Sequence, residues 1–211
     1  MIFNISRTKQ FTTRIQLKSK NIEVVSKTKL LGTIISNNLK WHENTKHLVK
    51  KAWARMQLVR KVCSFGVPLN EKLDIYKKFV RTHLEQSCTV WNSGLSKGNE
   101  NDIERVQKCV LKLILKHKYK SYKNALETVN IQTLKNRRDI LCAKFAHRSL
   151  RNEKTKHMFK PNIKRHHMKT RQKEKFKKTY AKSERLKRSA IPTMEKLLNK
   201  HNEDKEKMSH L

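Results

Sequence analysis

The spacing of apolar residues changes near Trp41 and divides the chain into a strand-like beginning and a helical remainder. Before Trp41, the runs NIEVV at 21–25 and LLGTII at 30–35 are rich in residues that favour a pleated, half-buried surface. Gly32, inside the second run, permits close approach of another backbone. We therefore predict a short hairpin that pairs 21–25 with 31–35.

Beyond Asn44 the apolar residues recur at steps of three and four, which predicts helices with one apolar face. Gly66 and Pro68 end the first helix, and Asn70 is the expected N-cap of the second. The loop at 92–101 holds two of the four glycines and has the composition of a turn. The apolar faces of the first three helices are Leu48, Ala52, Met56, Val59 and Cys63; Leu73, Tyr76, Phe79, Val80 and Leu84; and Ile103, Val106, Val110, Leu113 and Ile114. Further helices are expected at 122–129, 134–150 and 191–199.

Hydrophobic residues become sparse after Asn152. The segment 165–188 is basic and contains no glycine, and we expect it to be poorly ordered by itself. Pro192 is suited to the first turn of the last helix. The predicted fold class is mainly α, with a small N-terminal β-hairpin, a helical region and a basic, partly disordered tail.

The charge of the chain is far from balanced. Its 51 lysine and arginine residues outnumber 17 acidic residues and give a formal net charge of +34. Such a field attracts polyanions, and nucleic acid is the first partner to consider. An anionic membrane comes second, but no apolar segment approaches the roughly 20 residues needed to span a bilayer. The start of the chain, MIFNISRTKQ, lacks the apolar core of a secretory signal, so an intracellular location is expected, and the basic runs fit a nuclear one.

Two helices carry their cations as stripes opposite the apolar face, at 100° per residue. A charged stripe is usually a solvated face, but these two have few interleaved acids of the kind that form pairs at i,i+4. That scarcity favours contacts with phosphates. The candidate nucleic-acid-binding residues are Lys46, Lys50 and Lys61 on the first helix, and Arg105, Lys108, Lys112 and Lys116 on the third.

Other candidate chemistry has a simpler explanation. Glu100, Asp102 and Glu104 are acids at the start of a helix, where they complement the macrodipole. The four cysteines, Cys63, Cys88, Cys109 and Cys142, form no CxxC pair and have the pattern of small buried thiols. The neighbouring His166 and His167 diverge on a helix or strand. We expect no catalytic residue, no metal site and no cofactor.

Short motifs in a fixed order resemble the C-terminal part of the reverse transcriptase of jockey-like non-LTR retrotransposons, and the similarity covers nearly the whole chain. The motifs are KLLGTII, LKW, KKAWARMQLVRKV, YKKFV, LEQSCTVW, IERVQK, TLKNRR, HMFKPN and SAIPTMEKLLN. By this resemblance, Leu31 and Gly32 belong to a primer-grip hairpin that closes the palm. The resemblance implies a palm remnant at 1–41, a thumb-like region at 42–98, a post-thumb helical region at 99–152 and a basic tail at 153–211.

The resemblance also predicts an absence. Nucleotidyl transfer by two metal ions needs clustered carboxylates, which the family supplies as paired aspartates on palm strands. This chain has no such pair, and its aspartates are Asp74, Asp102, Asp139 and Asp204. The leading interpretation is therefore a noncatalytic fragment that binds template and primer, as RNA–DNA hybrid or duplex DNA, by backbone phosphates.

Two alternatives stay open. The chain can be the thumb portion of an active reverse transcriptase whose palm and fingers lie on an upstream segment, with which it would associate. It can also be a structural helical protein whose charge is incidental. Salt-sensitive duplex binding separates the leading interpretation from the structural one.

Overall fold

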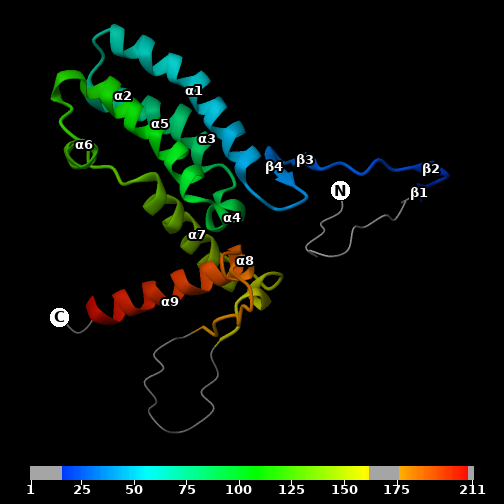
Figure 1. Ribbon diagram of the computed structural model, residues 1–211. Coiled ribbons are helices and arrows are strands. Elements are labelled where there is room, and N and C mark those ends of the chain that lie inside the picture. The colour runs from blue at the N-terminus through cyan, green and yellow to red at the C-terminus, as the bar shows by residue number, and fades with distance from the viewer. Residues whose placement is uncertain (1–15, 162–175, 209–211) are drawn as a thin grey trace. The chain divides into compact units, whose positions relative to one another are not determined.

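A computed structural model describes residues 16–161 and 176–208, with the side chains of Leu17 and of 201–208 left undescribed (Figure 1). The chain divides into two compact units. The first holds the described residues of Met1–Leu84 and Leu95–Ala125, and the second those of Glu85–Gly94 and Leu126–Leu211. Helices dominate both units and a small antiparallel hairpin precedes them, so the predicted fold class is confirmed.

The first unit begins with two short antiparallel pairs of strands. Strand β1 (Gln16–Leu17) pairs with β2 (Lys20–Asn21), and β3 (Lys27–Leu30) pairs with β4 (Thr33–Ser36). The predicted pairing of 21–25 with 31–35 is therefore wrong, because the partner of β4 starts six residues later than expected.

The reason for this register lies in the turn between β3 and β4. Leu31 and Gly32 both have positive φ, at 47° and 84°. A two-residue turn with two positive φ angles matches the right-handed twist of the flanking strands. Gly32 thus serves the turn rather than the close backbone approach that we predicted, and Leu31 is 89% exposed at the tip.

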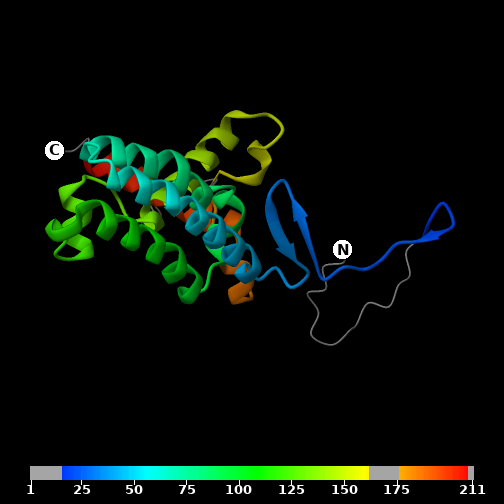
Figure 2. The same cartoon turned by 90° about the horizontal axis from the view of Figure 1, so that it is seen from above.

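Helix α1 (His42–Ser64) follows the hairpin after a short connection, 37–41, and the side chain of Asn44 links the two. The buried Asn44 accepts a hydrogen bond on Oδ1 from the backbone N–H of Ile34, at 3.0 Å. All five apolar positions predicted for this helix are buried, from Leu48 to Cys63. Helix α5 (Lys97–Leu115) runs alongside α1 (Figures 1 and 2). Its Ile103, Val106, Val110 and Ile114 are buried as predicted, whereas Leu113 is only partly buried.

The second predicted helix is three segments in succession: α2 (Leu69–Ile75), a π-helix, η1 (Tyr76–Arg81), and α3 (Thr82–Glu85). The helix begins at Leu69, directly after Pro68, so Asn70 is not its N-cap. Proline sets this start because its ring fixes φ and it has no N–H to satisfy. Phe79 is 46% exposed, since it lies about 100° around the helix from the buried Val80.

The expected turn at 92–101 is partly helical. Asn92–Gly94 forms a short 3-10 helix, η2, and α5 begins at Lys97. Ser96 caps α5 by accepting a hydrogen bond on Oγ from the N–H of Asn99, at 3.2 Å. This cap starts the helix early, which leaves Glu100 in its first turn and places Asp102 and Glu104 beyond it.

A buried hydrogen-bonded chain fixes η1 to α5 within the first unit. The Tyr76 hydroxyl donates to Gln107 Oε1, and the Gln107 amide donates to the hydroxyl of Tyr122, at 2.9 Å. Tyr122 donates in turn to Glu104. Burial, with Glu104 beside it, raises the pKa of Tyr122, so the phenol stays a donor at neutral pH. Glu104 therefore has a structural role.

The second unit is built around α7 (Leu134–Arg151) and α9 (Ala190–Met208). Their shared core contains Cys142, Ala146, Phe159, Met194 and Leu198. The smaller elements of this unit are α4 (Cys88–Trp91), η4 (Lys156–Met158) and α8 (Glu184–Lys187). Helix α6 (Tyr122–Thr128), α7 and α9 bear out the three later helix predictions, and α9 is longer than expected.

Part of the tail lies outside the description. His166, His167 and the first part of the glycine-free segment, 165–175, fall among residues 162–175, which the structure does not describe. Within the described ranges, no helix combines the length and the apolar character needed to cross a bilayer.

Candidate nucleic-acid interface

A groove lies between α1 and α5 in the first unit, and we call it the α1/α5 groove. Its volume is about 400 Å³ and it opens to solvent. Seven residues line it, five from α1 and two from α5: Thr45, Lys46, Val49, Lys50, Trp53, Asp102 and Arg105. Three of the predicted phosphate-binding cations therefore belong to a single concave surface.

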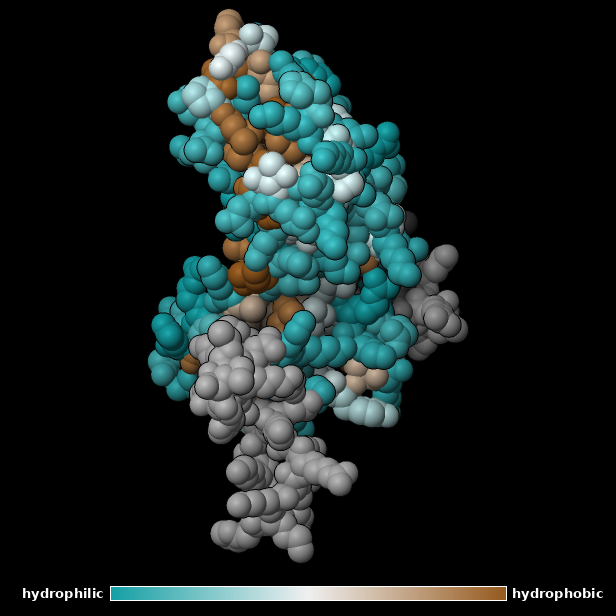
Figure 3. Space-filling view, turned by 90° about the vertical axis from the view of Figure 1, so that its left-hand side faces the viewer, coloured by the Kyte–Doolittle hydropathy of each residue, from teal (hydrophilic) through white to brown (hydrophobic). Residues whose placement is uncertain are grey.

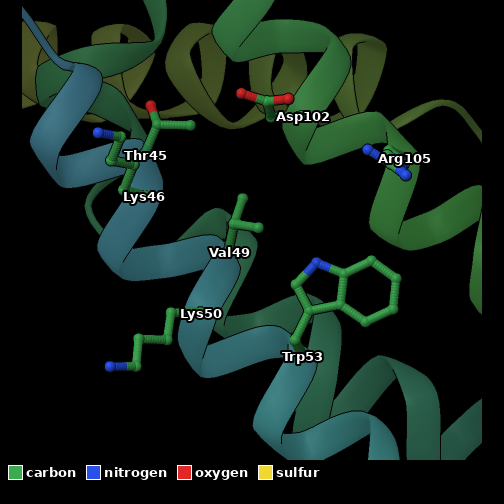
Figure 4. Close-up of a pocket in the computed structure, with 7 residues that line it drawn as sticks. All are labelled: Thr45, Lys46, Val49, Lys50, Trp53, Asp102 and Arg105. Carbon is green, nitrogen blue, oxygen red and sulfur yellow. The ribbon is translucent and has the colours of Figure 1, made fainter.

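The side chains divide the groove into an interior and a rim (Figure 4). Val49 and Trp53 project from α1 toward the side of α5, and Arg105 lies across from them. Lys46 and Lys50 contribute their stems, while their exposed ammonium ends point away from α5 on the α1 side. The arrangement is an aromatic and aliphatic interior with cations on both sides.

Few carboxylates neutralise these cations. Lys46 lies 3.8 Å from Glu43, which also pairs with Lys27 at 3.3 Å. The hydrogen bond and charge of Lys27, together with Lys46, hold the pKa of Glu43 below its ordinary value. Within the described part of the chain, neither Lys50 nor Arg105 has an ion-pair partner.

The remaining predicted cations of α5 lie away from the groove. The Lys108 Nζ sits 5.1 Å from the centre of the Tyr122 ring, and the Lys112 Nζ sits 5.5 Å from that of Tyr119. Lys116 follows the end of α5, with a φ of 50°. All three side chains are exposed, so we call them the α5 carboxyl-terminal cluster.

Lys61 stands apart from both groups, in the last turn of α1. It shares a helix face with Lys46 and Lys50, about 60° around the axis from Lys46, but it does not line the groove. Leu31 and Gly32 form the turn of the β3–β4 hairpin. The structure thus brings together Lys46, Lys50 and Arg105, and separately Lys108, Lys112 and Lys116.

Trp53 is a groove residue that our reading of the sequence did not single out, and Asp102 was interpreted there only as an acid near the start of a helix. The signal was available, because positions 46, 49, 50 and 53 follow the i, i+3, i+4, i+7 spacing of one helix face. Trp53 lies near the middle of that face, between Val49 and Lys46, and Val49 is the member next to the buried stripe. The α5 wall of the groove depends on tertiary packing, which spacing within α1 does not reveal.

The pKa values of two histidines report the cationic surroundings. Burial lowers the pKa of His47, and Lys51, Lys29 and Lys50 lower it further. Burial also lowers the pKa of His83, with Arg55 and Lys51 adding to the effect. Both imidazoles are therefore neutral at pH 7, so the charge near α1 resides in the lysines and arginines.

The surface is hydrophilic over most of the face drawn in Figure 3, with a hydrophobic strip at its upper end, over elements of the first unit, and smaller hydrophobic patches below it. The exposed large hydrophobic residues on helices of that unit are Leu58, Leu69 and Phe79, together with Phe65, the C-cap of α1.

Among the residues that the structure describes, no group of three or more histidines, cysteines or carboxylates is close enough to hold a metal ion. Cys63, Cys88 and Cys142 are buried thiols, and Cys109 is partly buried.

Comparison with known proteins gives no relative to guide the assignment. No protein family, no curated protein and no solved structure matches the chain.

Proposed function

We propose that this chain binds nucleic acid through the phosphate backbone and without sequence preference, as the thumb-like part of a retrotransposon reverse transcriptase. Its substrate is a template–primer duplex, as RNA–DNA hybrid or duplex DNA. The chain itself carries out no chemistry in this proposal. Phosphate contacts hold a duplex in position but do not read its bases, which suits a thumb.

One observation carries the proposal: the cations of the α1/α5 groove are exposed and few are neutralised. Lys50 and Arg105 have no carboxylate partner within the described ranges, and Lys46 shares Glu43 with Lys27. Solvated helix faces gain stability from paired charges at i,i+4, and these positions lack that gain. A polyanion supplies the missing counter-charge.

The β3–β4 hairpin supports a second element of the proposal, an association with a palm and fingers polypeptide. All four residues of β3 are exposed, and Leu30 is 57% exposed. A two-stranded hairpin is marginal in water, and an open strand edge is a template for further pairing. We infer that the missing strands of a palm pair at this edge.

Binding of a 20-base-pair duplex at a series of salt concentrations tests the function. Three phosphate contacts in the groove correspond to about −2.7 in the slope of log affinity against log salt on B-form DNA. We expect a slope at least that steep, equal for unrelated sequences. Binding that does not respond to salt, or no binding, refutes the proposal and favours a structural helical protein.

Primer extension provides the enzymatic test. The purified chain alone is expected to extend no primer with any divalent metal, because nucleotidyl transfer needs a carboxylate cluster. Adding the chain to a palm and fingers polypeptide of the same family is expected to raise extension by that polypeptide. Extension by the chain alone that survives replacement of Asp74 and Asp102 contradicts the noncatalytic assignment.

A further inference from the structure

The α1/α5 groove contains more than a phosphate site requires. Its volume of about 400 Å³ falls within the range of roughly 300–1,000 Å³ typical of pockets for small ligands. Backbone phosphates bind to exposed cations on convex helices and need no such hollow. The Val49 side chain and the Trp53 indole line its interior, so its shape and chemistry suit a flat, partly apolar group.

Trp53 is the residue that the core does not explain. The buried positions of α1 run through Leu48, Ala52, Met56 and Val59, and Trp53 lies about 60° or more around the axis from most of them. Its side chain is partly exposed and faces the groove, whereas Trp91 in the second unit is completely buried. An indole left open to solvent beside unpaired cations is typical of surfaces on which bases stack.

The cations on both walls fit the backbone on either side of such a base. Lys46 and Lys50 lie along the α1 rim and Arg105 lies on the α5 wall. Asp102, at one end of the groove, repels a phosphate but accepts a hydrogen bond from an exocyclic amino group such as that of cytosine. Phosphates thus match the rim, and a base matches the interior.

We propose that the α1/α5 groove holds an unpaired nucleotide of single-stranded nucleic acid, with its base stacked on Trp53 and its flanking phosphates on Lys46, Lys50 and Arg105. The bases of a duplex are already stacked on one another, so the groove selects single-stranded segments such as a template overhang. This inference rests on the proposed nucleic-acid binding and adds to it a preference that phosphate contacts alone do not give.

Fluorescence quenching detects the stacking directly. In a Trp41→Phe background, Trp53 is the one partly exposed tryptophan, because Trp91 is buried. Titration with a single-stranded oligonucleotide is expected to quench the emission, and a duplex of the same length is expected to quench it far less. Adding Trp53→Phe should abolish the quenching by the oligonucleotide while the variant still binds it.

Affinity measurements use Trp53→Leu, with Trp53→Phe as the conservative variant and Phe79→Leu as the control. Phe79 is an exposed aromatic residue of the same unit that does not line the groove. Loss of stacking on one base is expected to weaken single-strand binding by about 5- to 160-fold. Duplex binding should stay within about twofold, and Phe79→Leu should change neither.

The outcomes separate this inference from the proposed function. If Trp53→Leu leaves single-strand affinity unchanged, or weakens single-strand and duplex binding equally, the groove does not stack a base, yet salt-dependent binding still stands. If the wild-type chain binds no nucleic acid, both fail. If circular dichroism shows that Trp53→Leu does not fold, the quenching titration decides: no quenching by the oligonucleotide overturns the inference.

Discussion

The α5 carboxyl-terminal cluster allows the phosphate-contact proposal to be tested away from the groove. We consider the triple variant Lys108→Gln, Lys112→Gln and Lys116→Gln. Glutamine and lysine have similar helix propensity, so the helicity of α5 should barely change. The expected result is a shallower salt dependence of duplex binding, since each lost phosphate contact removes about 0.9 units from the slope.

The structure sets bounds on the size of this effect. Lys116 has no ring contact or ion pair within the described residues, so its loss alone should flatten the slope by about 0.9 units. Lys108 and Lys112 lie over the rings of Tyr122 and Tyr119, and each gives up about 0.5–1 kcal/mol of cation–π attraction if it moves to a phosphate. The triple variant should therefore flatten the slope by between about 0.9 and 2.7 units.

The assay is duplex binding measured at several salt concentrations for each variant. Lys77→Gln is the matched control, because Lys77 belongs to the same unit but pairs with Asp74 at 3.4 Å. The control should leave the slope nearly unchanged. If the triple variant has the slope of the wild type, these lysines are a solvated face, and other cations carry the binding.

Three further predictions concern the groove, the start of α5 and pH. Asp102→Asn is expected to raise the affinity for duplex by about 1.5- to 5-fold, since it removes a charge that repels phosphates from the groove. The equal charge change Glu71→Gln on α2 should have less effect. Ser96→Ala is expected to lower the free energy of unfolding by about 0.5–2 kcal/mol in urea titrations, because it removes the cap of α5; an unchanged value contradicts the role of the cap. The pKa values of His47 and His83 are lower in the folded chain than in the unfolded chain, so the unfolded chain binds protons first as the pH falls below about 6.5. The free energy of unfolding should therefore be fully present at pH 7 and decline toward pH 5. In urea titrations, the double variant His47→Gln and His83→Gln should show a smaller decline in the free energy of unfolding over the same pH range.

Local signals in the sequence predicted the helices but not all of their ends. The burial of Leu48, Ala52, Met56, Val59 and Cys63 follows from spacing alone, because an amphipathic helix must bury its apolar face. The early start of α5 depends on a cap at Ser96, which our interpretation of 92–101 as a turn did not include. The hairpin register depends on the positive φ of Leu31, and leucine rarely adopts a positive φ, so the sequence gives no sign of this turn.

The site was predicted as stripes of charge, and packing changed its form. The spacing of Lys46 and Lys50 placed both on one face of α1, which the structure confirms, since both are exposed and line the same groove. The position of Arg105 opposite them follows from the packing of α5 on α1 across about 50 residues of sequence. Sequence periodicity describes the faces of single helices, so it could not predict a groove that forms between two helices.

The same structure also separates the cations that have a structural explanation from those that do not. Lys112 and Lys116 lie at the carboxyl end of α5, where a positive charge complements the helix dipole. Lys108 and Lys112 in addition cover tyrosine rings. Lys50 and Arg105 have neither advantage: they lie in the middle of their helices, without a carboxylate partner among the described residues, beside an open indole. The large net positive charge of the chain weakens its compact state through self-repulsion. A ligand that carries phosphates offsets that cost. The α1/α5 groove is therefore a stronger candidate for binding than the α5 carboxyl-terminal cluster.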